Sequence, residues 1–166
     1  MKKILLILCL FLLCACSNSD EISRSENETY LDIINQLQEH EDFSNESELF
    51  DVTFDIAKTN DAYRFYIIID NAKTAMYDIC AVAIEKNVDY SKTMAANIGI
   101  FEDKKYSLIP NQSNPSKGYM KGISISGITN KNDPELYLLV EWNNKDMSKT
   151  HYEYIKVNNE VNNVQQ

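Results

Sequence analysis

Hydrophobic and polar residues alternate along most of the chain beyond residue 48. The clearest case runs from Phe50 to Ile56, where every second residue is apolar and the residues between are Asp, Thr and Asp. Successive side chains of a strand point to opposite faces, so this pattern predicts a strand with one buried and one solvated face. The same interpretation applies to seven further segments bounded by turn residues: Tyr63–Asp70, Met76–Ile84, Asn97–Phe101, Tyr106–Ile109, Met120–Ile128, Glu135–Trp142 and His151–Val157.

Seven or eight short strands without a helix between them predict an all-β fold. We expect an antiparallel Ig-like β-sandwich over residues 48–158, followed by a disordered tail at residues 159–166. One strand is expected at its centre, because four large apolar residues share a face: Leu136, Leu138, Val140 and Trp142. The Ig likeness is architectural, since the paired cysteines of antibody domains are missing. A small closed β-barrel is the alternative.

A helical period precedes the strands. Ser25 and Glu28 have the spacing of a capping box. Apolar residues follow at helical intervals: Tyr30, Leu31, Ile33, Ile34 and Leu37. This pattern predicts a short amphipathic helix, about Glu26 to Glu39 within the segment 26–42, whose apolar stripe packs on the domain. The run Glu39–Asp42 places acid where the helix dipole favours base, so we expect fraying at this end. A helix that binds a partner is the alternative.

The first 15 residues have the parts of a secretory signal peptide, because two lysines precede an apolar run that ends in a small residue. The run Ile4–Ala15 has twelve residues, too few to cross a hydrocarbon core of about 30 Å. Of the two cysteines at its end, only Cys16 follows a small residue, Ala15. Residues 16–25 show no apolar periodicity, so a flexible acidic tether is expected there.

Negative charge is concentrated near the N-terminus. The formal net charge is −9, but residues 17–61 carry 13 acidic and 2 basic residues, whereas residues 62–166 carry 12 of each. An acidic excess disfavours nucleic acid or a basic membrane-binding patch. An anionic membrane surface or cell wall would push such a segment outward, although solubility alone is the simpler interpretation.

The four residues Leu13-Cys14-Ala15-Cys16 resemble the bacterial lipobox, although Cys14 stands where alanine or serine is usual. The resemblance implies a diacylglyceryl thioether on Cys16 and cleavage between Ala15 and Cys16. An ordinary signal peptide with incidental cysteines is the alternative. The implied anchor places the protein in the cell envelope, on the outer face of the cytoplasmic membrane. After such processing Cys80 is the only free thiol, and its apolar neighbours predict that it is buried.

More of the chain is similar to small surface lipoproteins of low-GC Gram-positive bacteria that carry one Ig-like β domain of unassigned function. The stretches that carry this resemblance are YRFYIIIDNAKTAMYDICAVAI, NIGIFEDKKYSLIPNQSNPSKGYMKGISISG and LYLLVEW. The passage SLIPNQ…KGYMKGI is the most distinctive of them. The resemblance implies no catalytic residue.

Motifs for catalysis or metal binding are weak. His40 and His151 are the two histidines of the chain, and the serine motif Gly122–Gly127 lacks the second glycine of a nucleophile elbow. The run Glu39–Asp42 is most simply a solvated helix end, and the polar loops after residues 69 and 129 are read as turns rather than calcium sites. We therefore predict no catalytic residue, no metal and no cofactor.

Ten tyrosines suggest a binding surface instead. Four on predicted strands are candidate partner-binding residues: Tyr66, Tyr137, Tyr152 and Tyr154. If Ile155 and Val157 face the core, Tyr152 and Tyr154 face outward side by side. Ordinary cross-strand pairing of these rings is the simpler interpretation.

The sequence thus predicts a non-enzymatic, membrane-anchored binding or assembly module at the cell envelope. Its expected partner is an unidentified envelope protein or glycan, and no nucleic acid. An envelope enzyme, or an accessory subunit of one, is the alternative, and a structural spacer is a third. A cleft with convergent carboxylates favours the enzyme, whereas a flat aromatic patch favours binding.

Overall fold

The computed structural model describes residues 18–158 of the chain. The helix and strands in this range are α2 (Asn18–Glu39), β1 (Asp51–Lys58), β2 (Tyr63–Asp70), β3 (Tyr77–Ile84), β4 (Ala96–Ile98), β5 (Ser107–Leu108), β6 (Tyr119–Met120), β7 (Gly122–Thr129), β8 (Leu136–Asn143) and β9 (Thr150–Val157). A single turn of 3₁₀ helix, Pro115–Lys117, lies between β5 and β6. The predicted signal peptide, the predicted lipid attachment at Cys16 and the predicted tail at 159–166 lie outside the described residues.

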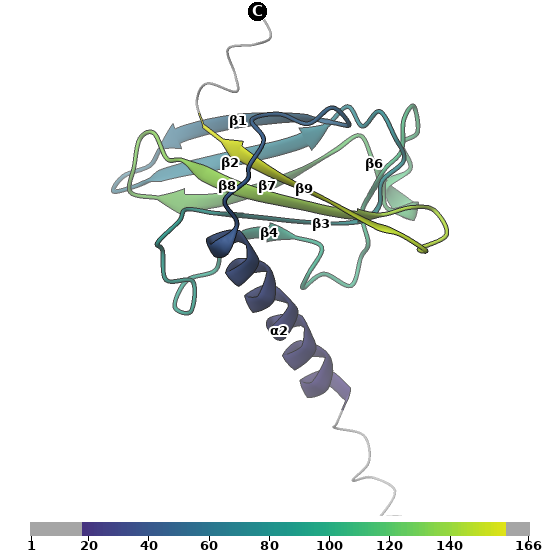
Figure 1. Ribbon diagram of the computed structural model, residues 1–166, viewed down its shortest axis with the longest axis horizontal. Coiled ribbons are helices and arrows are strands. Elements are labelled where there is room, and N and C mark those ends of the chain that lie inside the picture. The colour runs from purple at the N-terminus through teal and green to yellow at the C-terminus, as the bar shows by residue number, and fades with distance from the viewer. Residues whose placement is uncertain (1–17, 159–166) are drawn as a thin grey trace, which may run out of the picture.

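The strands form two antiparallel sheets that lie face to face (Figure 1). One sheet has three strands in the order β1-β2-β7, and the other has four in the order β4-β3-β8-β9. β5 and β6 form a small parallel pair. The predicted all-β sandwich of antiparallel strands is confirmed. The alternative of a closed barrel is wrong, because each sheet ends in edge strands.

Most predicted strands are found within a few residues of their expected positions, and the hairpin of β1 and β2 is confirmed. These two strands pair over eight residues, from Asp51 opposite Asp70 to Lys58 opposite Tyr63. The predicted strand Met120–Ile128 is instead divided. β6 pairs with β5, whereas β7 pairs with β2, so the chain changes its neighbour between these two strands.

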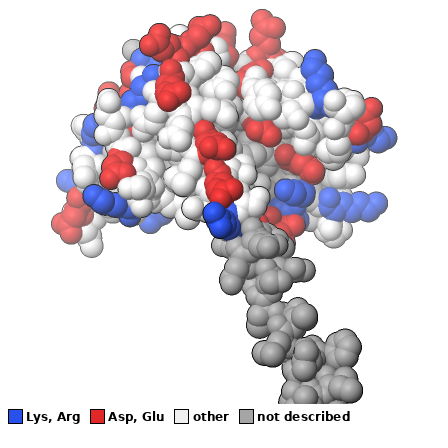
Figure 2. Space-filling view, turned by 60° about the horizontal axis from the view of Figure 1, so that its bottom comes forward, with Lys and Arg blue, Asp and Glu red and all other residues white. Residues whose placement is uncertain are grey.

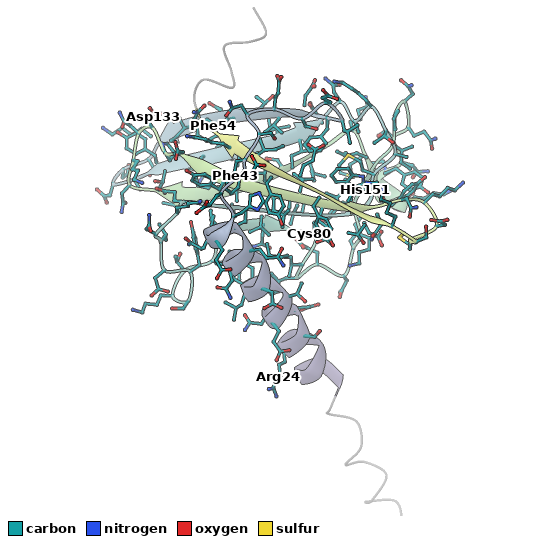
Figure 3. The ribbon with its side chains drawn as sticks, in the orientation of Figure 1. Arg24, Phe43, Phe54, Cys80, Asp133 and His151 are labelled. Atoms are coloured by element: carbon teal, nitrogen blue, oxygen red, sulfur yellow. The ribbon has the colours of Figure 1, made fainter. Side chains whose placement is uncertain are left out.

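The space between the two sheets is filled by alternate residues of the facing strands. Phe54 of β1 and Ile67 of β2 are fully buried there, as is Ile79 of β3. Figure 3 shows Phe54 among the strands. The predicted central face of β8 is confirmed, since all four of its apolar residues are buried in this layer: Leu136, Leu138, Val140 and Trp142. Full burial of one large apolar side chain contributes about 1.5–3 kcal/mol, so this layer stabilises the sandwich.

Helix α2 covers the outer face of the four-stranded sheet (Figure 1). Four residues of the predicted apolar stripe are buried there: Tyr30, Ile33, Ile34 and Leu37. They pack against Val82 and Ile84 of β3 and Leu139 of β8. The predicted packing of the stripe is confirmed, except that Leu31 is exposed. Because β3 and β8 are covered on both faces, they are apolar at nearly every position.

The predicted start of the helix is wrong. α2 begins at Asn18, so residues 18–25 are helical and do not form a flexible tether. Ser25 does not begin the helix; its carbonyl oxygen accepts a hydrogen bond from the Thr29 hydroxyl at 3.0 Å, within the helix. The residues before Ser25 include neither Gly nor Pro, the two residues that most disfavour a helix, so the helix can extend towards the N-terminus past the predicted start. The C-terminal end at Glu39 agrees with the prediction.

The segment after α2 covers part of the free edge of β9. The Ser44 amide donates to the Tyr154 carbonyl oxygen at 3.0 Å, and the Lys156 amide donates to the Ser44 carbonyl oxygen at 2.8 Å. Ser44 thus forms a short parallel bridge with this strand. β1 is the edge strand of the other sheet, and among the described strands it pairs with β2 alone.

Candidate ligand-binding site

The loops at one end of the sandwich surround an open hollow of ≈ 560 Å³, the loop hollow. Three segments far apart in sequence form its walls: residues 71–73 after β2, residues 108–113 around the end of β5, and Met120 with Lys121 where β6 passes into β7. In Figure 1 this is the end of the sandwich at which β6 lies and β2 finishes. Small-molecule sites have volumes of about 300–1,000 Å³, so the loop hollow has the size of a ligand site.

The wall after β5 is built on a tight turn. The Gln112 amide donates to the Ile109 carbonyl oxygen at 3.0 Å, Pro110 occupies the second position, and Asn111 at the third has a φ of 58°. This is a type II turn, in which proline fixes φ and asparagine tolerates the left-handed conformation. The turn places Asn111 and Gln112 in the lining of the loop hollow.

The remainder of this loop is held by hydrogen bonds within the loop and to its neighbours. Asn114 and Tyr119 exchange backbone hydrogen bonds of 2.8 and 3.1 Å, which close the chain around the 3₁₀ helix. The Lys104 ammonium donates to the Pro115 carbonyl oxygen at 2.7 Å. Gly118 has a φ of 77°, and a Cβ there would lie 2.3 Å from the Lys105 carbonyl oxygen. A wall fixed in this way is formed before a ligand arrives, which lowers the entropic cost of binding.

The lining of the loop hollow combines apolar and polar side chains. Ile109 and Met120 contribute apolar surface, and Asn111 and Gln112 contribute amides that both donate and accept hydrogen bonds. Lys73 and Lys121 contribute ammonium groups. Among the described residues that line it, none is acidic. The arrangement suits a polar ligand that carries hydrogen-bonding groups and negative charge.

The four predicted binding tyrosines do not form one surface. Tyr66 is exposed on the outer face of the three-stranded sheet. The other three lie on the face of the other sheet that α2 covers: Tyr137, Tyr152 and Tyr154. The predicted orientation of β9 is confirmed, because Ile155 and Val157 are buried between the sheets.

Tyr154 is half-buried under neighbouring rings, but together with Tyr152 it lines an open hollow of ≈ 430 Å³, so both tyrosines face away from the core as predicted and their partner binding stays a prediction. The His40 ring stacks on Tyr154 with 3.7 Å between the ring centroids. Phe43 lies against both Tyr154 and Tyr137, at 6.1 and 4.6 Å between ring centroids. The Glu135 carboxylate accepts a hydrogen bond from the Tyr137 hydroxyl and raises the pKa of Tyr137 to about 12. The segment after α2 turns back onto the sheet here, so Tyr152 alone stays half exposed.

Cys80 lies in a second open hollow of ≈ 440 Å³, between the middle of α2 and the four-stranded sheet. It is half-buried on the helix-covered face and not in the layer between the sheets, so the predicted full burial is wrong (Figure 3). Glu141 is its cross-strand neighbour on β8. Burial, followed by the charges of Glu141 and Glu102, raises the pKa of the Cys80 thiol to about 12. Burial also raises the pKa of the Glu141 carboxyl.

The protonated state of Cys80 predicts slow alkylation. In a Cys9→Ser, Cys14→Ser, Cys16→Ser chain, where Cys80 is the only thiol, we expect native Cys80 to react with iodoacetamide at pH 8 about a thousandfold more slowly than in urea, because the thiolate is the nucleophile. The folded pKa lies above the ordinary value of 9.0, so this group favours the folded state below pH 9 and the advantage is lost as pH rises towards 12. Equal native and denatured rates would contradict the assignment.

Both histidines take part in aromatic stacking. His151 stacks on Trp142, with 5.3 Å between centroids and 9° between ring planes. The segment Gly122–Gly127 forms part of β7, in agreement with its interpretation as a strand. Within residues 18–158, no three His, Cys, Asp or Glu side chains are placed together to hold a metal ion.

Comparison of the chain with family models, curated proteins and solved structures found no match. In the part of the chain that the structure describes, no helix has both the length and the apolar character to span a bilayer. The residues of the loop hollow were not predicted as a site. Pro110–Asn111 is a recognisable turn signal, but nothing in the sequence joins this turn to residues 71–73.

Proposed function

We propose that the protein is a lipid-anchored, non-enzymatic binding module of the cell envelope, and that its ligand occupies the loop hollow. The observation that carries the proposal is the fixed polar wall of this hollow, which is built on the type II turn of residues 109–112. Binding residues are often placed on loops that a rigid scaffold positions. The two-sheet core is such a scaffold, because a continuous layer of buried apolar side chains holds its two sheets together.

The sandwich of this proposal is Ig-like. In Ig domains one sheet contains strands A, B and E, and the other contains C, F and G, to which variable-type domains add C′. Numbering the strands in chain order gives A-B-E for β1-β2-β7 and C′-C-F-G for β4-β3-β8-β9. This correspondence supports the assignment. Between β4 and β7 the chain forms only the short pair β5 and β6, which joins neither of the two described sheets, and this corresponds to the loss of strand D.

The proposed anchor leads directly into the fold. Ser17 alone separates Cys16 from α2, and the helix packs on the four-stranded sheet from Tyr30 onward. The 22 residues of α2 span about 33 Å. A helix in this position restricts the orientation of the sandwich relative to the anchor far more than a flexible tether does. Figure 2 shows acidic and basic side chains interspersed on the face from which α2 extends.

Replacement of Cys16 tests the anchor. We expect Cys16→Ala to abolish incorporation of a palmitate analogue and to release the protein from the membrane fraction, because the thiol is the acyl acceptor. Cys14→Ala is the matched control and should keep both the label and the membrane fraction. Undiminished labelling of the Cys16→Ala protein would exclude the proposed anchor.

A further inference from the structure

The lining of the loop hollow carries an unusual charge for this chain. The net charge of the protein is −9, yet two lysines and no acidic residue are among the described residues that form the hollow. Both lysines are exposed at the surface. The ion pairs between described residues involve Arg24, Lys92, Lys131 and Lys156, so neither Lys73 nor Lys121 has its charge neutralised within that part of the chain.

The fold, rather than side-chain flexibility alone, brings these two lysines to one hollow. The Lys73 amide donates to the Leu49 carbonyl oxygen at 2.8 Å, which ties this loop to the segment before β1. Lys121 immediately precedes Gly122, which is paired with Asp70 at the end of β2. Asp70 lies beside Asp51, and burial followed by the Asp51 charge raises the pKa of the Asp70 carboxyl. Asp51 also accepts a hydrogen bond of 2.8 Å from the Asn71 side-chain amide, but neither Asp51 nor Asp70 is among the described residues that line the hollow, whose charged residues are Lys73 and Lys121.

We propose that the loop hollow binds an anionic carbohydrate, with its carboxylate or phosphate group held by Lys73 and Lys121. This inference rests on the proposed function and names the class of its ligand. Ammonium groups form strong charge-assisted hydrogen bonds with both anions. The amides of Asn111 and Gln112 supply donors and acceptors for sugar hydroxyls, and Ile109 with Met120 supplies an apolar surface for the C–H face of a sugar ring.

The negative charge of the rest of the molecule opposes the binding of an anion, so the affinity depends on the two lysines. Thirteen acidic residues lie between residues 17 and 61, so the field of the whole chain repels an anion at long range. Salt screens exposed charges beyond a separation of about 8–10 Å at physiological ionic strength. Binding therefore depends on close contact with Lys73 and Lys121, and removal of both charges leaves only the amides and the apolar surface.

Three small probes test the proposal on the ¹⁵N-labelled full-length protein in detergent micelles. Glucuronate carries a carboxylate, glucose 1-phosphate carries a phosphate, and glucose is the uncharged control sugar. We expect both anions to shift the backbone amide signals of Asn111, Gln112 and Lys121, and glucose to shift them only at much higher concentration. Glucuronate and glucose 1-phosphate also distinguish a carboxylate ligand from a phosphate ligand by their relative affinities.

A charge-matched pair of double variants isolates the lysines. Lys73→Gln with Lys121→Gln should weaken binding of both anions about tenfold or more, because both ion pairs are lost. Lys145→Gln with Lys149→Gln removes the same charge from exposed positions in the β8–β9 hairpin and should leave the affinity within about twofold.

The outcomes separate this inference from the proposed function. One outcome is that glucose shifts the same amide signals as strongly as the two anions do, with shifts of the same size in the Lys73 and Lys121 double variant. That result would overturn the selectivity for anions but would keep the loop hollow as a binding site. Tetraglutamate, an acidic peptide without a sugar, is a fourth probe, and its tighter binding than that of either anionic sugar would overturn the carbohydrate class. No shift in the loop hollow with any of these probes would overturn both the inference and the site on which it rests.

Discussion

Leu37→Ala is expected to lower the free energy of unfolding by about 2–5 kcal/mol, the range measured for large-to-small substitutions in close-packed cores. Leu37 is fully buried between α2 and the four-stranded sheet. It belongs to the same cluster as Val82 and Leu139, which the helix shields from water. Truncation leaves a cavity in this cluster, and the helix that carries it cannot close the gap without losing its other contacts.

Leu31→Ala on the same helix is the matched control for Leu37→Ala. Leu31 is 39% exposed, so we expect a change within about 0.5 kcal/mol. Urea unfolding monitored by Trp142 fluorescence measures both variants, with the midpoint falling for Leu37→Ala at an unchanged slope. Equal midpoints for the two variants would show that the helix does not pack on the sheet as described.

Gly99→Ala is expected to destabilise the fold by about 3 kcal/mol or more, since two separate effects combine. Gly99 has a φ of 85°, where an L-residue costs roughly 1–2 kcal/mol. A Cβ would also lie 2.2 Å from the Ile79 carbonyl oxygen, and a backbone atom of a paired strand cannot easily move away. The Gly99 amide, which donates to the Glu102 carboxylate at 2.7 Å, would be displaced with it.

Gly122→Ala is the control for Gly99→Ala, because it also replaces a glycine by alanine but does not place the new Cβ as close to a backbone atom. Gly122 begins β7 in an extended conformation, and its added Cβ would meet the Asp70 side chain at 2.9 Å. We expect a loss of about 1 kcal/mol, well below that of Gly99→Ala. Thermal unfolding followed by circular dichroism compares the two. A Gly99→Ala protein as stable as Gly122→Ala would contradict the close approach of β4 to β3.

The sequence predicted the strands well because a half-buried strand alternates between apolar and polar residues. β1 and β2 follow this rule, and their hairpin was placed correctly. β3 and β8 are apolar on both faces, so their pattern did not show which residues meet the other sheet and which meet α2. The start of α2 was missed because Ser25 and Glu28 imitate a capping box inside a continuous helix.

The candidate site was harder to predict than the fold, because it is assembled from parts that are separate in sequence. The turn at Pro110–Asn111 could be recognised, but its proximity to Lys73 and Lys121 depends on how β5 pairs with β6 and Met76. The orientation of Tyr154 followed from alternation, whereas its cover by His40 depends on the path of the chain after the helix. Local periodicity carries no information about such long-range placement.

The bridge of Ser44 to β9 has a consequence for neighbouring molecules. The proposed anchor would hold copies of the protein in one thin layer at high local concentration, where exposed strand edges can join into continuous sheets. The hydrogen bonds of Ser44 to Tyr154 and Lys156 occupy backbone groups that an incoming strand would use. At one edge of the three-stranded sheet, Asp51 and Asp55 of β1 set negative charge against the same strand of a second copy. One edge of each sheet is thus protected against pairing with a strand of a neighbouring molecule.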